Sequence, residues 1–183
     1  VAPQRCAPGT YQNQTGQTDC IVCDDGKYKS DVTAEECTRC PRGAQCAEPE
    51  QFTWCKPGYF QDQETQTMCH ACVSGRYAPE EGAEDCIDCP LGQRCPNPAT
   101  VGTNCTPGYF QDEVNMMYCK SCEGGKYTST EGQSHCTVCD KGHWCNETTS
   151  TPCERGYHQP LEQAQQCIAC RRGYFVAESA AID

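Results

Sequence analysis

The residues of this chain that could do the most varied chemistry are its cysteines, which number 21 among 183 residues. The string C-x2-C-x13-C-x2-C occurs three times, over residues 20–40, 69–89 and 119–139. Four thiolates at such spacing are typical of a structural zinc site, and a single C-x2-C pair is typical of thiol–disulfide exchange. Structural disulfides are the third chemistry available to these side chains.

Disulfides account for the pattern better than the two reactive alternatives. A zinc site in each string leaves Cys6, Cys46 and their equivalents without a role, whereas disulfides use all six cysteines of a copy. Thiol exchange requires an exposed thiolate at a helix start in a βαβ unit, and the sequence predicts no such unit. We therefore expect structural disulfides, with no metal and no cofactor.

Other residues with catalytic or metal-binding potential do not form a recognisable site. No GxSxG, HExxH or phosphate-binding loop occurs, and the acidic pairs Asp24-Asp25 and Glu80-Glu81 lack the alternating oxygen ligands of a calcium loop. Four histidines are scattered without ligand spacing: His70, His135, His143 and His158. We expect no enzyme, no catalytic residue and a solvated acidic surface.

The cysteines divide the chain into repeats of about 49 residues. First cysteines of successive copies are 49, 50 and 48 residues apart, and each copy reads C-x13-C-x2-C-x13-C-x2-C-x5-C until the fourth, which stops early. Such a period predicts an array of small domains. The predicted domains are a linker at 1–5, cysteine-rich repeats at 6–54, 55–104 and 105–152, and a partial repeat at 153–183.

The composition excludes several classes of protein. Large aliphatic residues are scarce, so the chain cannot bury a core that offsets its conformational entropy, and disulfides must replace that core. Each 13-residue loop is of the size for which a cross-link contributes roughly 3 kcal/mol. Disulfides indicate an extracellular or cell-surface location. A formal charge of −11 without a basic cluster disfavours nucleic acid and anionic membranes, and no apolar run could span a membrane.

The simplest pairing closes every loop on itself. It uses twenty cysteines and leaves Cys170 unpaired, with a partner expected at position 184 of a longer array. An interleaved alternative, with Cys20–Cys37, Cys23–Cys40 and Cys6–Cys46, stays open because sequence alone does not fix connectivity. The sequential pairs are Cys6–Cys20, Cys23–Cys37, Cys40–Cys46, Cys55–Cys69, Cys72–Cys86, Cys89–Cys95, Cys105–Cys119, Cys122–Cys136, Cys139–Cys145 and Cys153–Cys167.

Each long loop carries a glycine three residues after its first cysteine, followed by an aromatic residue, as in Gly9 with Tyr11 and Gly58 with Tyr59. The glycine predicts a tight turn with positive φ, and the aromatic is expected to cover the disulfide. Short segments such as GKY and GYFQ predict two- or three-residue strands in hairpins, and 30–37 and 79–86 predict at most a helical turn. Trp54 and Trp144, near copy junctions, are expected to pack between repeats or to anchor a partner.

Three N-glycan acceptors occur: Asn13-Gln14-Thr15, Asn146-Glu147-Thr148 and Asn104-Cys105-Thr106. We expect glycans at Asn13 and Asn146, and with less support at Asn104 because its neighbour belongs to a predicted disulfide. Thr148, Thr149, Ser150 and Thr151 before Pro152 form a candidate O-glycan cluster.

The segment CAPGTYQNQTGQTDCIVCDDGKY, residues 6–28, resembles the ephrin-receptor-like cysteine-rich repeat, which is related to tumour-necrosis-factor-receptor cysteine-rich domains. The resemblance implies a small disulfide-rich fold: an elongated rod of tandem repeats with short β-hairpins and little regular secondary structure. It also implies that the first cysteine of a unit bonds the one about fourteen positions on. The uniform period predicts a structural component of an extracellular filament, appendage or cell-surface coat, whose partners are copies of itself or other extracellular structural proteins. The alternative is the ligand-binding ectodomain of a cell-surface receptor.

Overall fold

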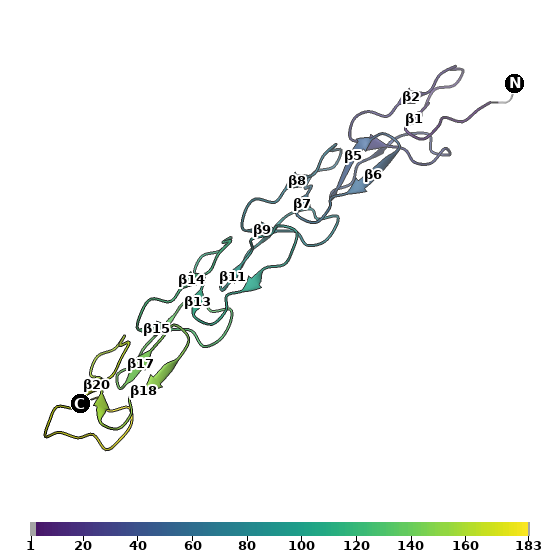
Figure 1. The fold of residues 1–183 in the computed structure, drawn as a ribbon. Coiled ribbons are helices and arrows are strands. Elements are labelled where there is room, and N and C mark those ends of the chain that lie inside the picture. Colours follow the sequence, from purple (N-terminus) through teal and green to yellow (C-terminus); the bar gives the residue numbers. More distant parts are fainter. Residues whose placement is uncertain (1–2, 183) are drawn as a thin grey trace. The chain divides into compact units, whose positions relative to one another are not determined.

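The computed structural model describes residues 3–182, and this part of the chain consists of short antiparallel hairpins with no helix (Figure 1). Two compact units are present, Val1–Asp88 with Asn97–Val101, and Cys89–Pro96 with Gly102–Asp183. The segments at 30–37 and 79–86 contain turns and bends instead of helix. The prediction of a small disulfide-rich fold with little regular secondary structure is confirmed.

Ten two-stranded sheets follow one another along residues 3–182. The first unit contains β1 (Thr10–Tyr11) with β2 (Ile21–Val22), β3 (Lys27–Tyr28) with β4 (Thr38–Arg39), β5 (Ala44–Glu48) with β6 (Gln51–Trp54), β7 (Tyr59–Phe60) with β8 (His70–Ala71), and β9 (Arg76–Tyr77) with β10 (Ile87–Asp88). The second unit contains β11 (Gln93–Arg94) with β12 (Thr103–Asn104), β13 (Tyr109–Phe110) with β14 (Lys120–Ser121), β15 (Lys126–Tyr127) with β16 (Thr137–Val138), β17 (His143–Cys145) with β18 (Ser150–Pro152), and β19 (Tyr157–His158) with β20 (Ile168–Ala169).

Each long-loop hairpin is built in the same way from a turn glycine and a C-x2-C pair. In β7–β8, Gly58 has φ +87°, and the Tyr59–Phe60 strand after it pairs with the two residues between Cys69 and Cys72. The Cys72 N–H then donates to the Gly58 carbonyl at 2.9 Å. The turn therefore needs positive φ, which only glycine adopts at no steric cost.

Ten disulfides hold these hairpins, with Cα–Cα separations of 5.7–5.9 Å, inside the usual range. All ten are pairs of the sequential scheme, and none belongs to the interleaved one. Cys170 is the one free thiol among the described residues. Disulfides of this loop size restrict the unfolded chain and so stabilise the folded one.

The buried interior consists mainly of these cysteines. One cluster contains Cys40, Ala44 and Cys46, with Tyr28 and Phe52 packed against it. The aromatic residues after the turn glycines are only half-buried or exposed, and Tyr174 is 76% exposed. That each of these rings covers its own disulfide stays a prediction, and Tyr28 packs on the next disulfide along the chain, Cys40–Cys46.

Turn glycines also make contacts beyond their own loop, with the second disulfide-closed loop that follows along the chain. A Cβ at Gly43 would overlap the backbone carbonyl of Gly82, and the Gly82 N–H donates to the Cys55 carbonyl at 2.9 Å. Gly82 itself has φ +78°. Equivalent close approaches join Gly26 to Thr65, Gly92 to Gly132, Gly125 to Gln163, and Gly142 to Ala180. Successive loops are therefore interlocked through backbone groups rather than joined by free linkers.

Buried glutamines close the first loop of each later copy. The Gln61 side chain is 1% exposed, its Nε2 donates to the Met68 carbonyl at 2.7 Å, and its Oε1 accepts from the Gln63 N–H at 3.1 Å. Gln111 and Gln159 make the same pair of bonds, and half-buried Gln12 does so in the first copy. These amides satisfy backbone groups inside a loop that is too short to pair them with one another.

Candidate functional site

The cysteines of the candidate zinc and thiol-exchange strings are all oxidised in the structure. In the first two copies these are eight residues, each in a disulfide, as are their equivalents in the third copy: Cys20, Cys23, Cys37, Cys40, Cys69, Cys72, Cys86 and Cys89. A disulfide sulfur is not a thiolate, so it is neither a zinc ligand nor a nucleophile. Within residues 3–182, no group of three or more His, Cys, Asp or Glu residues is placed to hold a metal ion.

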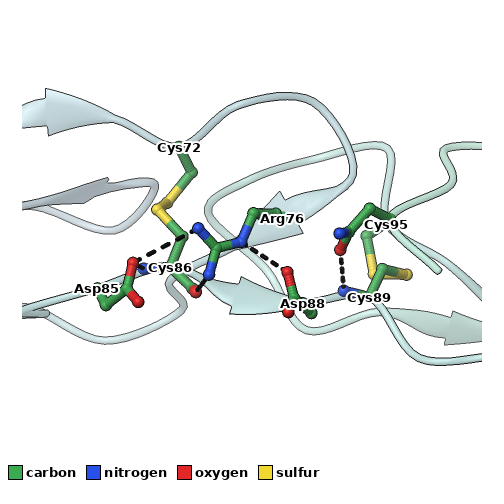
Figure 2. Close-up of polar contacts among 8 residues, drawn as sticks. Cys72, Arg76, Asp85, Cys86, Asp88, Cys89 and Cys95 are labelled. Atoms are coloured by element: carbon green, nitrogen blue, oxygen red, sulfur yellow. Dashed lines mark hydrogen bonds and ion pairs between the residues drawn. A yellow bond between two sulfur atoms is a disulfide. The ribbon is translucent and has the colours of Figure 1, made fainter.

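The most connected charged group lies on the β9–β10 hairpin (Figure 2). The Arg76 Nε lies 2.7 Å from the Asp88 carboxylate, and an Arg76 terminal nitrogen lies 3.5 Å from that of Asp85. The guanidinium also donates to the Cys86 carbonyl. Because these groups hold β10 and the Cys86 residue just before it, the arrangement stabilises the hairpin.

A second charged group lies on β13–β14. Lys120 Nζ is 2.7 Å from the Asp112 carboxylate and 2.8 Å from that of Glu113. The hydrogen bond from Lys120 lowers the pKa of Asp112, and the hydrogen bonds to the two carboxylates raise the pKa of Lys120. Both pKa shifts favour the charged forms of Asp112 and Lys120, which suits a solvated ion pair rather than proton transfer.

The three glycan acceptors differ in their surroundings. Asn13 is exposed and lines a cavity of about 170 Å³ beside Tyr11. Asn146 is exposed, and its Oδ1 accepts hydrogen bonds from the N–H and hydroxyl groups of Thr148 and Thr149. Asn104 is exposed at the end of β12, and its Oδ1 accepts from Gln93 Nε2 at 3.0 Å. N-glycosylation of these three asparagines stays a prediction.

The two tryptophans lie on different strands, Trp54 on β6 and Trp144 on β17, but border cavities at equivalent places in the repeat. Trp54 is 50% exposed, packs edge-to-face on Phe52 at 5.0 Å, and lies beside Gly82 of the next copy. It lines a cavity of about 270 Å³ with Tyr59. Trp144 is half-buried and lines a cavity of about 370 Å³ in the second unit. Trp54 thus packs against the next copy, and part of each indole stays open.

Two features were not predicted from the sequence. They are the buried glutamines and the residues with left-handed backbone ten positions after the first cysteine of a long loop. The signal for the glutamines was present, since each follows its turn glycine by three positions, at Gln12, Gln61, Gln111 and Gln159. The left-handed position has no sequence signal, because its residue type varies: Gly16 and Gly82 occupy it in some loops, and Thr65, Asn115 and Gln163 in others.

Comparison with known families agrees with this geometry. The family described as tyrosine-protein kinase ephrin type A/B receptor-like matches residues 9–53 and 58–104, just over half of the chain. The chain belongs to this ephrin-receptor-like family. The two matches support an array of cysteine-rich repeats, and the repeated disulfide pattern agrees with them. A comparison with curated proteins finds no match.

Membership of the ephrin-receptor-like family fixes a broad class of function. Its cysteine-rich repeat is a non-catalytic extracellular module, and together with the disulfides it indicates an extracellular or cell-surface domain. In the described part of the chain, no helix has the length and hydrophobicity needed to cross a bilayer.

Proposed function

We propose that this ephrin-receptor-like array is a structural component of an extracellular filament, appendage or cell-surface coat, in which it acts as a glycosylated rod. The observation that carries this proposal is the interlocking of successive loops. At the junction of the first two copies, the Gly43 and Cys46 N–H groups donate to the carbonyls of Gln61 and Gln66 at 2.8 and 2.9 Å. A junction closed by backbone bonds resists bending, which a load-bearing or spacing element requires.

The surface supports association with extracellular protein rather than with nucleic acid or lipid. The chain has a formal charge of −11, and its ion pairs lie on solvated hairpins. Exposed apolar side chains such as Val22, Val73 and Tyr118 recur on separate loops instead of forming one site. Repeated, weak lateral contacts of this kind suit assembly with copies of the chain or with similar structural proteins.

A second candidate is the ligand-binding ectodomain of a receptor. It is favoured by the family's description as receptor-like and by the half-open indoles of Trp54 and Trp144. Exposed aromatic side chains beside a cavity are typical anchors at protein interfaces.

The deciding experiment is electron microscopy and analytical ultracentrifugation of the chain secreted from an oxidising host, over a range of concentrations. Filaments or sheets that form reversibly and dissolve when the disulfides are reduced would support the structural proposal. A chain that stays monomeric up to high concentration, and remains so when mixed with the native extracellular material, would contradict it. A search for a protein ligand with Trp54→Ala and Trp144→Ala as controls would then test the receptor candidate.

A further inference from the structure

Two of the three glycan acceptors follow an aromatic residue by two positions. Tyr11 precedes Asn13, and Trp144 precedes Asn146, whereas Asn104 has a glycine at that place. Residues two apart in an extended chain project from the same face, about 7 Å from each other. That distance brings the first sugar of an N-linked glycan onto the neighbouring ring.

The structure places Tyr11 and Asn13 together in this way. Tyr11 ends β1, and Gln12 after it turns toward the inside of the loop, where its Nε2 donates to the Asp19 carbonyl at 2.8 Å. Tyr11 and Asn13 lie on the other side and line one cavity of about 170 Å³. Asn13 itself is exposed, so its amide is accessible for modification.

Apart from Cys37, the remaining walls of this cavity are polar. Asp24, Lys27 and Glu36 line it, and Lys27 Nζ lies 2.7 Å from the Asp24 carboxylate. A sugar ring has apolar C–H groups on its faces and hydroxyl groups on its rim. An aromatic ring matches the first, while charged and hydrogen-bonding side chains match the second.

The chain around Asn146 has the same alternation. Cys145 is 2% exposed because it points inward to its disulfide, so Trp144 and Asn146 on either side of it project outward. The Asn146 Oδ1 is held by hydrogen bonds from Thr148 and Thr149. This orients the carboxamide and leaves its nitrogen as the atom that carries the glycan.

We propose that the N-linked glycan on Asn13 packs on the ring of Tyr11, and that the glycan on Asn146 packs on Trp144. The inference rests on the glycosylation included in the proposed function. Attachment joins the asparagine nitrogen to C1 of an oligosaccharide, which leaves its lipid diphosphate carrier while the amide loses one proton. The packed sugar then covers apolar ring surface that the small hairpin cannot bury, and so holds its loop closed.

The test is a double-mutant cycle on the chain secreted from a eukaryotic host, with the parent, Asn13→Gln, Tyr11→Leu and the double variant. Peptide mass spectrometry first measures glycan occupancy at Asn13. Hydrogen exchange then reports opening of the loop between Cys6 and Cys20. Loss of the glycan should speed exchange about 2- to 10-fold when the tyrosine is present, and hardly at all when leucine replaces it.

Tyr11→Phe is the matched control, since it keeps the ring and should keep the coupling to the glycan. Nuclear Overhauser contacts between the Tyr11 ring and sugar protons give a second, direct readout. A glycosylated Asn13 whose removal has the same effect in both backgrounds, or a ring without contacts to sugar, would overturn this inference alone. An unmodified Asn13 and Asn146 would overturn the proposed glycosylation together with it.

Discussion

Replacement of Gln61 by alanine tests whether a buried amide holds each first loop closed. The side chain is 1% exposed and bonds the Met68 carbonyl at 2.7 Å and the Gln63 N–H at 3.1 Å. Alanine leaves both partly buried backbone groups without their side-chain partner, and a hydrogen bond of this kind contributes about 0.5–1.5 kcal/mol. We expect a loss of about 1–2 kcal/mol in the free energy of local opening, which corresponds to about 5- to 30-fold faster opening.

The assay is native-state hydrogen exchange with all disulfides intact, because a cross-linked repeat array does not unfold in one step. The informative amides are those of Gly43 and Cys72, which donate to the carbonyls of Gln61 and Gly58. Gln63→Ala is the matched control, since its side chain is exposed. If Gln61→Ala changes the exchange rates no more than Gln63→Ala does, the Gln61 hydrogen bonds do not hold the loop closed and the reasoning is refuted.

Three further changes test other contacts. Gly43→Ala should abolish secretion of correctly paired chain because its Cβ would overlap a backbone carbonyl. Gly16→Ala has a similar φ but open space around it, so it should lower the free energy of unfolding by only about 1 kcal/mol. Equal secretion yields of the two variants would contradict this. Lys120→Gln should raise the pKa of Asp112 toward its ordinary value in an NMR titration. The lowered pKa implies stabilisation that is present above the ordinary carboxyl pKa and lost as pH falls through the lowered value; an unchanged midpoint would contradict the ion pair. Arg76→Met should speed exchange in β9–β10 several-fold, and no change would show that its ion pairs are unimportant.

The features that could be predicted from the sequence are those that depend on the spacing of residues within one loop. The interval between Cys55 and Cys69 sets a loop that one disulfide can close, and a glycine at position 58 marks the turn that begins its first strand. The short strands follow because only two residues separate Cys69 from Cys72, and these two form β8. Each of these inferences needs only residues within one loop.

The features that could not be predicted depend on which loop lies beside which. Nothing around Gly26 indicates that the carbonyl of Thr65, about forty positions later in the sequence, fills the space of its missing side chain. How far each aromatic ring is itself buried could not be predicted for a related reason. That burial depends on a neighbouring side chain, as for Tyr28, whose ring lies 5.0 Å from that of Phe52.

The left-handed residues show how contact between loops overrides local preference. Thr65 has φ +63°, a conformation that a β-branched residue avoids. It is held there because its N–H donates to the Cys40 carbonyl at 2.9 Å, while its own carbonyl lies against Gly26. The turn glycine and the residue ten positions after a cysteine therefore act as one contact between loops. Because that contact is made by backbone atoms, it tolerates Gly, Thr, Gln or Ala at the left-handed position, whereas the turn position is glycine in each of these contacts.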